Sequence, residues 1–308
     1  IISMSLGYEG GTPNAPDAIA VDNAVNVGVI AVVAVGNSGP ALASISCPGC
    51  ARKAITVGAS DAEDNVAEFS SRGPAHNEYH TSILKPDIVA PGVLICSSRL
   101  PDFNPWEFNE DYQLCYDDEH VLLSGTSMAT PLVTGAVALI KQAHLDWSSD
   151  EIKSALTLNT RDLNREVSEQ GSGRINAFNS INPKFIASTN MLNFEDIGIG
   201  RQKTIQLTFH NLDDEEIQFE LVVTNENSET ELNLSRDLFR LQPDESIDIN
   251  VTLQVIEDRE PYFELQGGII NVVTNNQNIS SLPFSFYKFT SKKVDNVFEI
   301  GEGETLLN

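Results

Sequence analysis

A serine stands at the start of a predicted helix in the string Ser124-Gly125-Thr126-Ser127-Met128-Ala129-Thr130-Pro131. The first turn of a helix has backbone N–H groups without intrahelical partners, and the helix dipole favours negative charge there. Ser127 in that position could attack a carbonyl carbon while its own N–H faces the oxyanion that develops. A serine can also simply cap a helix, which is a common use of this residue type. The string alone therefore leaves a nucleophile and a cap as the two interpretations of Ser127.

An asparagine follows a solid apolar run in the string Val33-Ala34-Val35-Gly36-Asn37-Ser38-Gly39-Pro40. The run is rich in β-branched residues, as expected of a strand buried on both faces of a parallel sheet. Ligand sites of open parallel sheets lie beyond the carboxyl ends of the strands, which is where Asn37 falls. Asparagine is also common in ordinary turns. An amide at this edge can stabilise the oxyanion of a tetrahedral intermediate as a side-chain donor.

Up to Asn182 the sequence alternates between strand and helix patterns, which predicts an α/β domain with a parallel sheet. The strands are expected at Ile2–Leu6, Val29–Val35, Ala54–Val57 and Ile88–Val89, and the helices at Ala15–Val27, Thr126–Leu145 and Ser149–Asn159. Ser148 or Ser149 is the expected N-cap of the last helix. The sheet must bring the two strings together if they share a site.

From Pro183 the hydropathy pattern changes to short segments in which apolar and polar residues alternate. Five such segments, separated by turn-rich stretches, predict an antiparallel β-sandwich over residues 183–288. They are Ile205–Phe209, Ile217–Val223, Ile247–Val255, Ile269–Thr274 and Leu282–Phe286. Residues 289–308 are interpreted as a linker or tail.

The formal net charge of −25 over 308 residues excludes some functions. The acidic excess is spread over both parts of the chain, and such a surface disfavours nucleic acid as a partner. We find no apolar run long enough to span a membrane. Ordinary solubility explains the charge as well as an extracellular or salty environment does.

The remaining residues that could do chemistry are four cysteines: Cys47, Cys50, Cys96 and Cys115. The Cys-x-x-Cys spacing of the first two is compatible with a zinc knuckle or a redox pair, but a second such motif is missing. We expect two disulfides formed in an oxidising compartment, with Cys96–Cys115 closing a loop. Free buried thiols are the remaining alternative.

The serine string, together with Gly135-Ala136-Val137-Ala138-Leu139-Ile140, resembles the serine motif of the subtilisin-like serine proteases (subtilases, peptidase family S8). Gly36-Asn37-Ser38-Gly39 resembles the oxyanion segment of that family. Further family strings follow in order: Ser5-Leu6-Gly7, Ser46-Cys47-Pro48-Gly49, Thr56–Ala59, Phe69–Pro74, Lys85–Gly92 and Gly171–Ala177. The resemblance covers residues 1–182, and the remainder is similar, more weakly, to the fibronectin-III-like modules that follow many secreted subtilases.

The resemblance implies a three-layer α/β domain and a secreted serine endopeptidase that acts on proteins or peptides. Ser127 and Asn37 are then the catalytic residues of this chain, and Thr126 supports the oxyanion. The substrate-binding residues implied are Ser5, Leu6, Gly7, Gly36 and Ser46. No cofactor is needed for the chemistry, although a structural calcium ion is compatible with the family.

The chain lacks the family's Asp-Ser/Thr-Gly and His-Gly-Thr-His strings, which carry the orienting acid and the general base. None of the five histidines, His76, His80, His120, His144 and His210, has a His-Gly context, and we assign none of them as the base. We expect a missing N-terminal segment of the same protease to supply both residues. The alternative is a catalytically inactive subtilase-fold protein with a binding or surface-structural role.

Two further features bear on the substrate. The stretch from Cys96 to Ser124 is acidic and directly precedes the nucleophile, so it is interpreted either as a solvated loop or as a site for calcium or basic substrate residues. The predicted pocket segments offer Ser38 and Ser46 and no carboxylate, which predicts a broad or apolar preference. Leu132 stands where the family usually has a histidine, a difference that concerns helix packing rather than chemistry.

Overall fold

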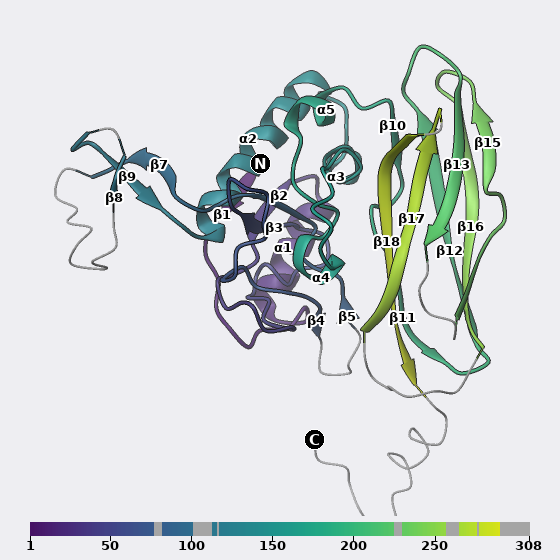
Figure 1. Cartoon of the computed structure of the whole chain (residues 1–308), viewed down its shortest axis with the longest axis horizontal. Helices are drawn as coiled ribbons and strands as arrows, with labels where there is room; N and C mark the ends of the chain where they lie inside the picture. Colours follow the sequence, from purple (N-terminus) through teal and green to yellow (C-terminus); the bar gives the residue numbers. More distant parts are fainter. Residues whose placement is uncertain are drawn as a thin grey trace, which may run out of the picture. The chain divides into compact units, whose positions relative to one another are not determined.

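The computed structural model describes residues 1–76, 82–100, 113–115, 117–224, 230–256, 265–275 and 277–289. The chain divides into two compact units, Ile1–Asn190 and a second that begins at Met191 (Figure 1). The boundary between the two units thus falls after Pro183, where the hydropathy pattern of the sequence changes. The short strand β10 (Phe185–Ala187) stays with the first unit because the Ala187 N–H donates to Ser154 Oγ at 2.9 Å.

A parallel sheet forms the centre of the first unit, in the order β1, β2, β3, β6. Its strands are β1 (Ile2–Met4), β2 (Ala31–Ala34), β3 (Ile55–Ser60) and β6 (Ile88–Pro91). The side chains of β2 are buried throughout, as the unbroken apolar run predicts for a strand covered on both faces. The predicted parallel sheet is therefore present, with strand ends that differ from the expected ones by a few residues.

Helices cover both faces of this sheet. On one side, α1 (Pro16–Asn26) packs Ala18, Val21 and Val25 against a cluster that includes Val33 and Val35. Side chains alternate along a strand, so the intervening residues of β2 face the opposite side. There α2 (Thr126–Ala143) packs across β1, β2, β3 and β6 with a buried apolar stripe (Figure 1). The helix–sheet–helix layering places the start of α2 next to the carboxyl ends of β1 and β2.

Three shorter helices follow α2 in the chain. Helix α3 (Ser149–Thr157) begins with a capping box, in which Ser148 Oγ accepts from the Glu151 N–H and Glu151 accepts from the Ser148 N–H. Ser148 is therefore the N-cap. Helices α4 (Val167–Gln170) and α5 (Ala177–Ile181) complete the unit.

A buried ion group ties β3 to the segment before β6. Asp87 accepts from Lys85 and Lys153, each at 2.7 Å, and also from the Thr56 N–H at 2.8 Å. Burial lowers the pKa of Lys85 to about 8, although the attraction of Asp87 acts in the opposite direction. Burial alone would raise the pKa of Asp87, but the two lysines outweigh it and lower that pKa.

A small antiparallel sheet precedes the nucleophile string and consists of β7 (Ile95–Ser98), β8 (Gln113–Leu114) and β9 (His120–Leu123). The Cys96–Cys115 disulfide joins its first two segments, as predicted. The short strands β4 (Ala75–His76) and β5 (Ser82–Ile83) pair elsewhere in the unit. Most of the acidic side chains expected in this insertion (Asp102, Glu107, Glu110 and Asp111) lie outside the described residues.

The second unit consists of strands in two sheets. One contains β12 (Gln202–Asn211), β16 (Ser246–Val255) and β14 (Thr230–Leu234), and the other β11 (Leu192–Gly198), β18 (Gln277–Phe289), β17 (Leu265–Thr274), β13 (Ile217–Thr224) and β15 (Leu238–Leu241). Phe209 of the first sheet contacts Phe219 and Phe239 of the second, with ring centroids 5.7 and 5.5 Å apart. The β11–β18 pair is parallel. The prediction that all strands of this unit pair in antiparallel fashion is therefore wrong for this pair. Residues 290–308 lie outside the described residues.

Candidate active site

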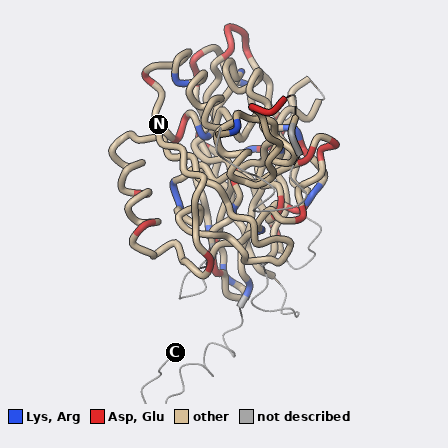
Figure 2. Tube along the Cα trace, turned by 90° about the vertical axis from the view of Figure 1, so that its left-hand side faces the viewer, with Lys and Arg blue, Asp and Glu red and all other residues tan. Residues whose placement is uncertain are grey.

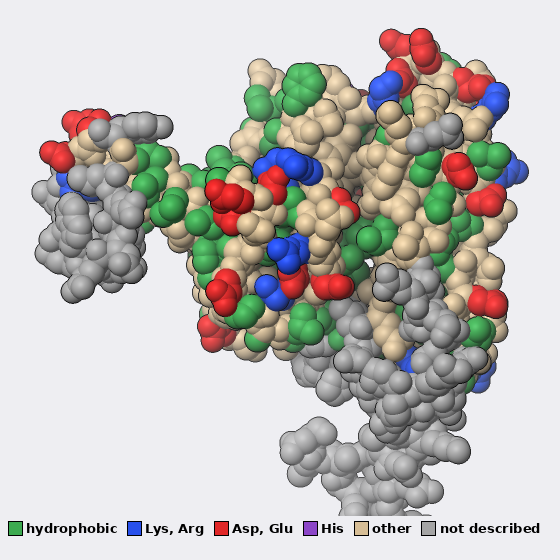
Figure 3. All heavy atoms as spheres, in the orientation of Figure 1, with side chains coloured by type: hydrophobic (Ala, Val, Ile, Leu, Met, Phe, Trp, Pro, Cys, Tyr) green, Lys and Arg blue, Asp and Glu red, His purple; other side chains and the backbone are tan. Residues whose placement is uncertain are grey.

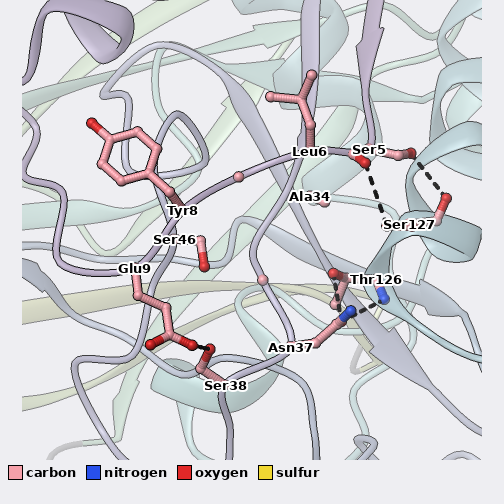
Figure 4. Close-up of a pocket in the computed structure, with 12 residues that line it drawn as sticks. Ser5, Leu6, Tyr8, Glu9, Ala34, Asn37, Ser38, Ser46, Thr126 and Ser127 are labelled. Carbon is pink, nitrogen blue, oxygen red and sulfur yellow. Dashed lines mark hydrogen bonds between the residues drawn. The ribbon is translucent and has the colours of Figure 1, made fainter.

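A pocket of about 340 Å³ opens beside the start of α2 (Figure 4). Every site residue predicted from the sequence lies in its lining: Ser5, Leu6, Gly7, Gly36, Asn37, Ser46, Thr126 and Ser127. Tyr8, Glu9, Ala34 and Ser38 complete the wall. The parallel sheet thus brings together three segments that are far apart in the sequence, at the edge where ligand sites of such sheets form.

Ser127 is the second residue of α2, and its side chain is only loosely held. Its hydroxyl lies 3.5 Å from the Ser5 carbonyl oxygen, longer than an ordinary O–H···O hydrogen bond. The side chain is partly exposed to the pocket. Its proton is therefore available to a base, and its oxygen can reach a carbonyl carbon placed in the pocket.

Pro131 explains how the backbone of Ser127 is anchored to the neighbouring strand. Proline has no N–H, so the Ser127 carbonyl, four residues earlier, lacks its helical partner. The Ser5 hydroxyl donates to this carbonyl at 2.9 Å (Figure 4). Ser127 and the segment after β1 are thereby fixed relative to each other.

Asn37 is oriented by Thr126. The Thr126 N–H and the Thr126 hydroxyl both lie 2.9 Å from the Asn37 Oδ1 atom. A backbone N–H can only donate, so the side-chain atom that faces it must be the carbonyl oxygen of the amide. The Nδ2 group is consequently left to donate elsewhere, which is what an oxyanion partner requires.

Asn37 Nδ2 and the Ser127 backbone nitrogen border a common space beside Gly125. A Cβ atom built on Gly125 would lie 3.3 Å from Asn37 Nδ2 and 3.7 Å from the Ser127 backbone nitrogen. The φ angle of Gly125 is +155°, which side chains rarely adopt. Glycine at this position leaves that space empty and the helix N-terminus open.

Glycine is also required in the pocket wall. A Cβ on Gly36 would come within 2.3 Å of Ser46 Oγ and 2.8 Å of Ser71 Oγ, and its φ angle is +109°. A side chain at this position would displace the wall, and this requirement accounts for Gly36 between β2 and Asn37.

Glu9 corrects the prediction that the pocket contains no carboxylate. It lines the pocket, and its Oε1 atom accepts from the Ser38 hydroxyl at 2.6 Å. The preceding residue fixes its position, because Tyr8 and Cys47 exchange two backbone hydrogen bonds of 2.9 and 3.0 Å. Sequence reasoning missed Glu9 because it follows the Ser5-Leu6-Gly7 string without belonging to any motif.

A disulfide cross-links the segment of the pocket wall that pairs with Tyr8. Cys47 and Cys50 form a disulfide, and both are fully buried. With Cys96–Cys115, all four cysteines are paired, so the zinc knuckle and free-thiol interpretations of Cys47 and Cys50 do not hold. The Tyr8 hydroxyl donates to Asp17, and this hydrogen bond raises the pKa of Tyr8.

The histidine side chains that the structure describes are engaged away from Ser127. His144 stacks on Trp147 and its Nε2 lies 2.8 Å from the Ile181 carbonyl, while His210 belongs to the second unit. His120 Nδ1 lies 2.7 Å from Asp117 Oδ1, an arrangement like that of a catalytic base and its acid, and this bond lowers the pKa of Asp117. The three strand steps of β9 place His120 about 10 Å beyond Leu123, away from the helix start. His80 and the side chain of His76 lie outside the described residues.

Within the described part of the chain, no three His, Cys, Asp or Glu side chains are grouped so that they could hold a metal ion. No helix there is long and apolar enough to cross a membrane. Acidic residues are distributed along the trace of the chain (Figure 2). On the face shown in Figure 3 they alternate with other residue types and do not merge into one patch.

Comparison with known proteins identifies the family of this chain. The pattern of the subtilase family matches residues 1–173, and the chain therefore belongs to the subtilase family. It is 39% identical over 193 residues to the serine protease AprX of Bacillus subtilis (strain 168), which covers 59% of this chain and 42% of AprX. It is 37% identical over 177 residues to Subtilisin BL of Lederbergia lenta, covering 58% of this chain and 54% of that protein. The chain thus spans about half the length, or less, of these relatives.

Proposed function

We propose that this chain carries the nucleophile half of a serine endopeptidase site. Ser127 Oγ attacks the carbonyl carbon of a peptide bond while a base removes its proton. Asn37 Nδ2 and the Ser127 N–H stabilise the oxyanion of the tetrahedral intermediate. As that intermediate collapses, the C–N bond breaks and the base gives the serine proton to the leaving amine. Water then attacks the acyl-enzyme, which releases the acid product and restores the Ser127 hydroxyl. The observation that carries the proposal is the pair of hydrogen bonds from Thr126 that hold the Asn37 amide oxygen and leave the amide nitrogen to donate to another group.

The general base and the orienting acid are proposed to come from polypeptide outside this chain. Two surfaces support this. Among the described residues, β1 pairs only with β2, so one edge of the parallel sheet is open. Beside it, α2 exposes Leu132 and Leu139, which are 45% and 49% accessible. An open strand edge next to exposed apolar side chains is typical of a surface that another segment covers.

The substrate is proposed to be a protein or peptide that binds in extended form along Ser5, Leu6 and Gly7. These residues follow the edge strand and line the pocket, so their backbone can pair with an added strand. The two disulfides, Cys47–Cys50 and Cys96–Cys115, support an oxidising, extracellular location. We also propose that the second unit is a fibronectin-III-like domain and that the protein binds a structural calcium ion. A calcium titration, followed by measurement of the thermal unfolding temperature, tests the calcium ion.

The experiment is active-site labelling of the full-length protein, meaning this chain together with the proposed upstream segment. A fluorophosphonate probe is expected to attach to Ser127, and Ser127→Ala is expected to abolish the labelling. A control Ser124→Ala variant keeps the nucleophile, and its labelling should persist. Folded full-length protein without any labelling would support the other hypothesis, an inactive binding or surface-structural protein.

A further inference from the structure

We propose that Glu9 makes the pocket select a lysine or arginine side chain on the substrate residue whose carbonyl is attacked. The inference rests on the proposed function, since it names the substrates of the same site. Asn37 and Ser127 stand at this pocket, so a carbonyl held between them directs the side chain of its own residue into the pocket. The residues that line the pocket therefore decide which side chain is accepted.

The position of Glu9 is set by its neighbours. Tyr8 is paired with Cys47 through the backbone, and this pairing fixes the chain one residue before Glu9. The carboxylate then accepts from Ser38 Oγ, and the Ser38 N–H in turn donates to the buried Ser71 hydroxyl at 3.0 Å. Glu9 is thus connected to the interior through Ser38, and its carboxylate lies beside the Ser38 hydroxyl on the wall of the pocket (Figure 4).

The charge of Glu9 has no counterpart in the pocket. It is the one charged side chain among the residues that line it, and the others are glycine, serine, threonine, asparagine, tyrosine, leucine and alanine. Within the described residues no lysine, arginine or histidine forms an ion pair with Glu9, and the hydroxyl of Ser38 engages one of its two oxygens. A carboxylate that is hydrogen-bonded but not ion-paired can still receive a cation.

A lysine or arginine side chain matches this pocket in two respects. Its aliphatic stem can lie along Leu6 and Ala34, and its charged end can reach the carboxylate. A leucine side chain would fill the same space without the ion pair, and a glutamate would place two like charges together. Because the pocket is open to solvent, water and salt reduce the gain from the ion pair to the range of exposed pairs.

The test measures kcat/KM of the full-length protein on four fluorogenic peptides that differ only at the residue before the cleaved bond, which is Lys, Arg, Leu or Glu. Glu9→Gln keeps the size of the side chain and the acceptor for Ser38. It is expected to lower the Lys-to-Leu ratio of kcat/KM by about twofold to fivefold. Glu63→Gln, an exposed residue outside the pocket, changes the net charge equally and is expected to leave the ratio unchanged.

A charge reversal and a salt series complete the test. Glu9→Lys is expected to make the Glu peptide a better substrate than the Lys peptide. The Lys preference of the unmodified protein should weaken as sodium chloride is added. Equal Lys-to-Leu ratios in the unmodified and Glu9→Gln proteins would overturn the inference while leaving the protease proposal intact. Absence of cleavage of all four peptides, with no fluorophosphonate labelling, would instead refute the proposed function.

Discussion

Thr126 holds the Asn37 amide by two hydrogen bonds, and removing one of them tests whether that orientation matters for catalysis. Thr126→Val deletes the hydroxyl donor, which lies 2.9 Å from Asn37 Oδ1, and keeps the backbone N–H at the same distance. The side chain is buried at 1% exposure, and valine has nearly the same shape. The substitution therefore loosens the amide without removing the oxyanion donor itself.

The size of the effect follows from one net hydrogen bond, which is worth about 1 kcal/mol. If the oriented amide acts mainly in the transition state, this energy appears in the barrier and lowers kcat about fivefold. KM should change little, because the ground-state carbonyl depends less on the donor. The assay is steady-state cleavage of a fluorogenic peptide by the full-length protein, together with the rate of fluorophosphonate labelling.

Thr130→Val is the matched control. Thr130 is also fully buried in α2, and its hydroxyl donates to the Thr126 carbonyl at 2.8 Å without touching Asn37. We expect this control to leave kcat within about twofold, since it only perturbs the helix. We also expect Thr126→Val to add little in an Asn37→Ala background, because the amide that it orients is then gone. Equal losses in the two threonine variants, or additive losses with Asn37→Ala, would refute the role of the oriented amide.

Three further predictions concern the surroundings of the site. Gly125→Ala places a methyl group 3.3 Å from Asn37 Nδ2, in a backbone conformation that is unfavourable for alanine. The rate of fluorophosphonate labelling of Ser127 should therefore fall at least tenfold, and unchanged labelling would contradict the assigned oxyanion space. Ser5→Ala removes the hydroxyl that donates to the Ser127 carbonyl, which has no helical partner because of Pro131. The kcat/KM value should fall about fivefold, with partial recovery in Ser5→Thr. An unchanged kcat/KM would show that this hydrogen bond is dispensable. Lys85 binds its proton more weakly in the folded state than in the unfolded state, because its pKa is lowered to about 8, so stability should rise as the pH increases from about 8 to 10.5. In a Ser127→Ala background, urea unfolding should show this rise, by up to about 3 kcal/mol, relative to Lys85→Met, and parallel pH profiles would contradict it.

The sequence predicted the parts of the site that rest on local patterns. The apolar run of β2 and the glycine before Asn37 indicate a buried strand that ends in a turn, and the string around Ser127 indicates a helix start. Because the carboxyl ends of parallel strands share one edge of a sheet, the meeting of these strings could be anticipated. The resemblance to subtilases supplied the predicted substrate-binding residues, which also line the pocket: Ser5, Leu6, Gly7, Gly36 and Ser46.

Other features depend on contacts between distant segments and could not be predicted from local patterns. Glu9 enters the pocket because Tyr8 pairs with Cys47, a contact between loops that no periodicity indicates. The link between Ser5 and the Ser127 carbonyl arises from Pro131 inside a helix and a hydroxyl on another element. The parallel β11–β18 pair is likewise a matter of strand order, which alternation of apolar and polar residues does not determine.

The most direct test of the account is the site of fluorophosphonate attachment. The full-length protein is treated with the probe, digested and analysed by mass spectrometry, beside its Ser127→Ala variant and beside the 308-residue chain alone. We predict one probe per molecule on Ser127 in the full-length protein, and none in the variant or in the chain alone, because we assign no general base to this chain. Attachment at another residue, absence of attachment in the folded full-length protein, or efficient labelling of the chain alone would contradict the account.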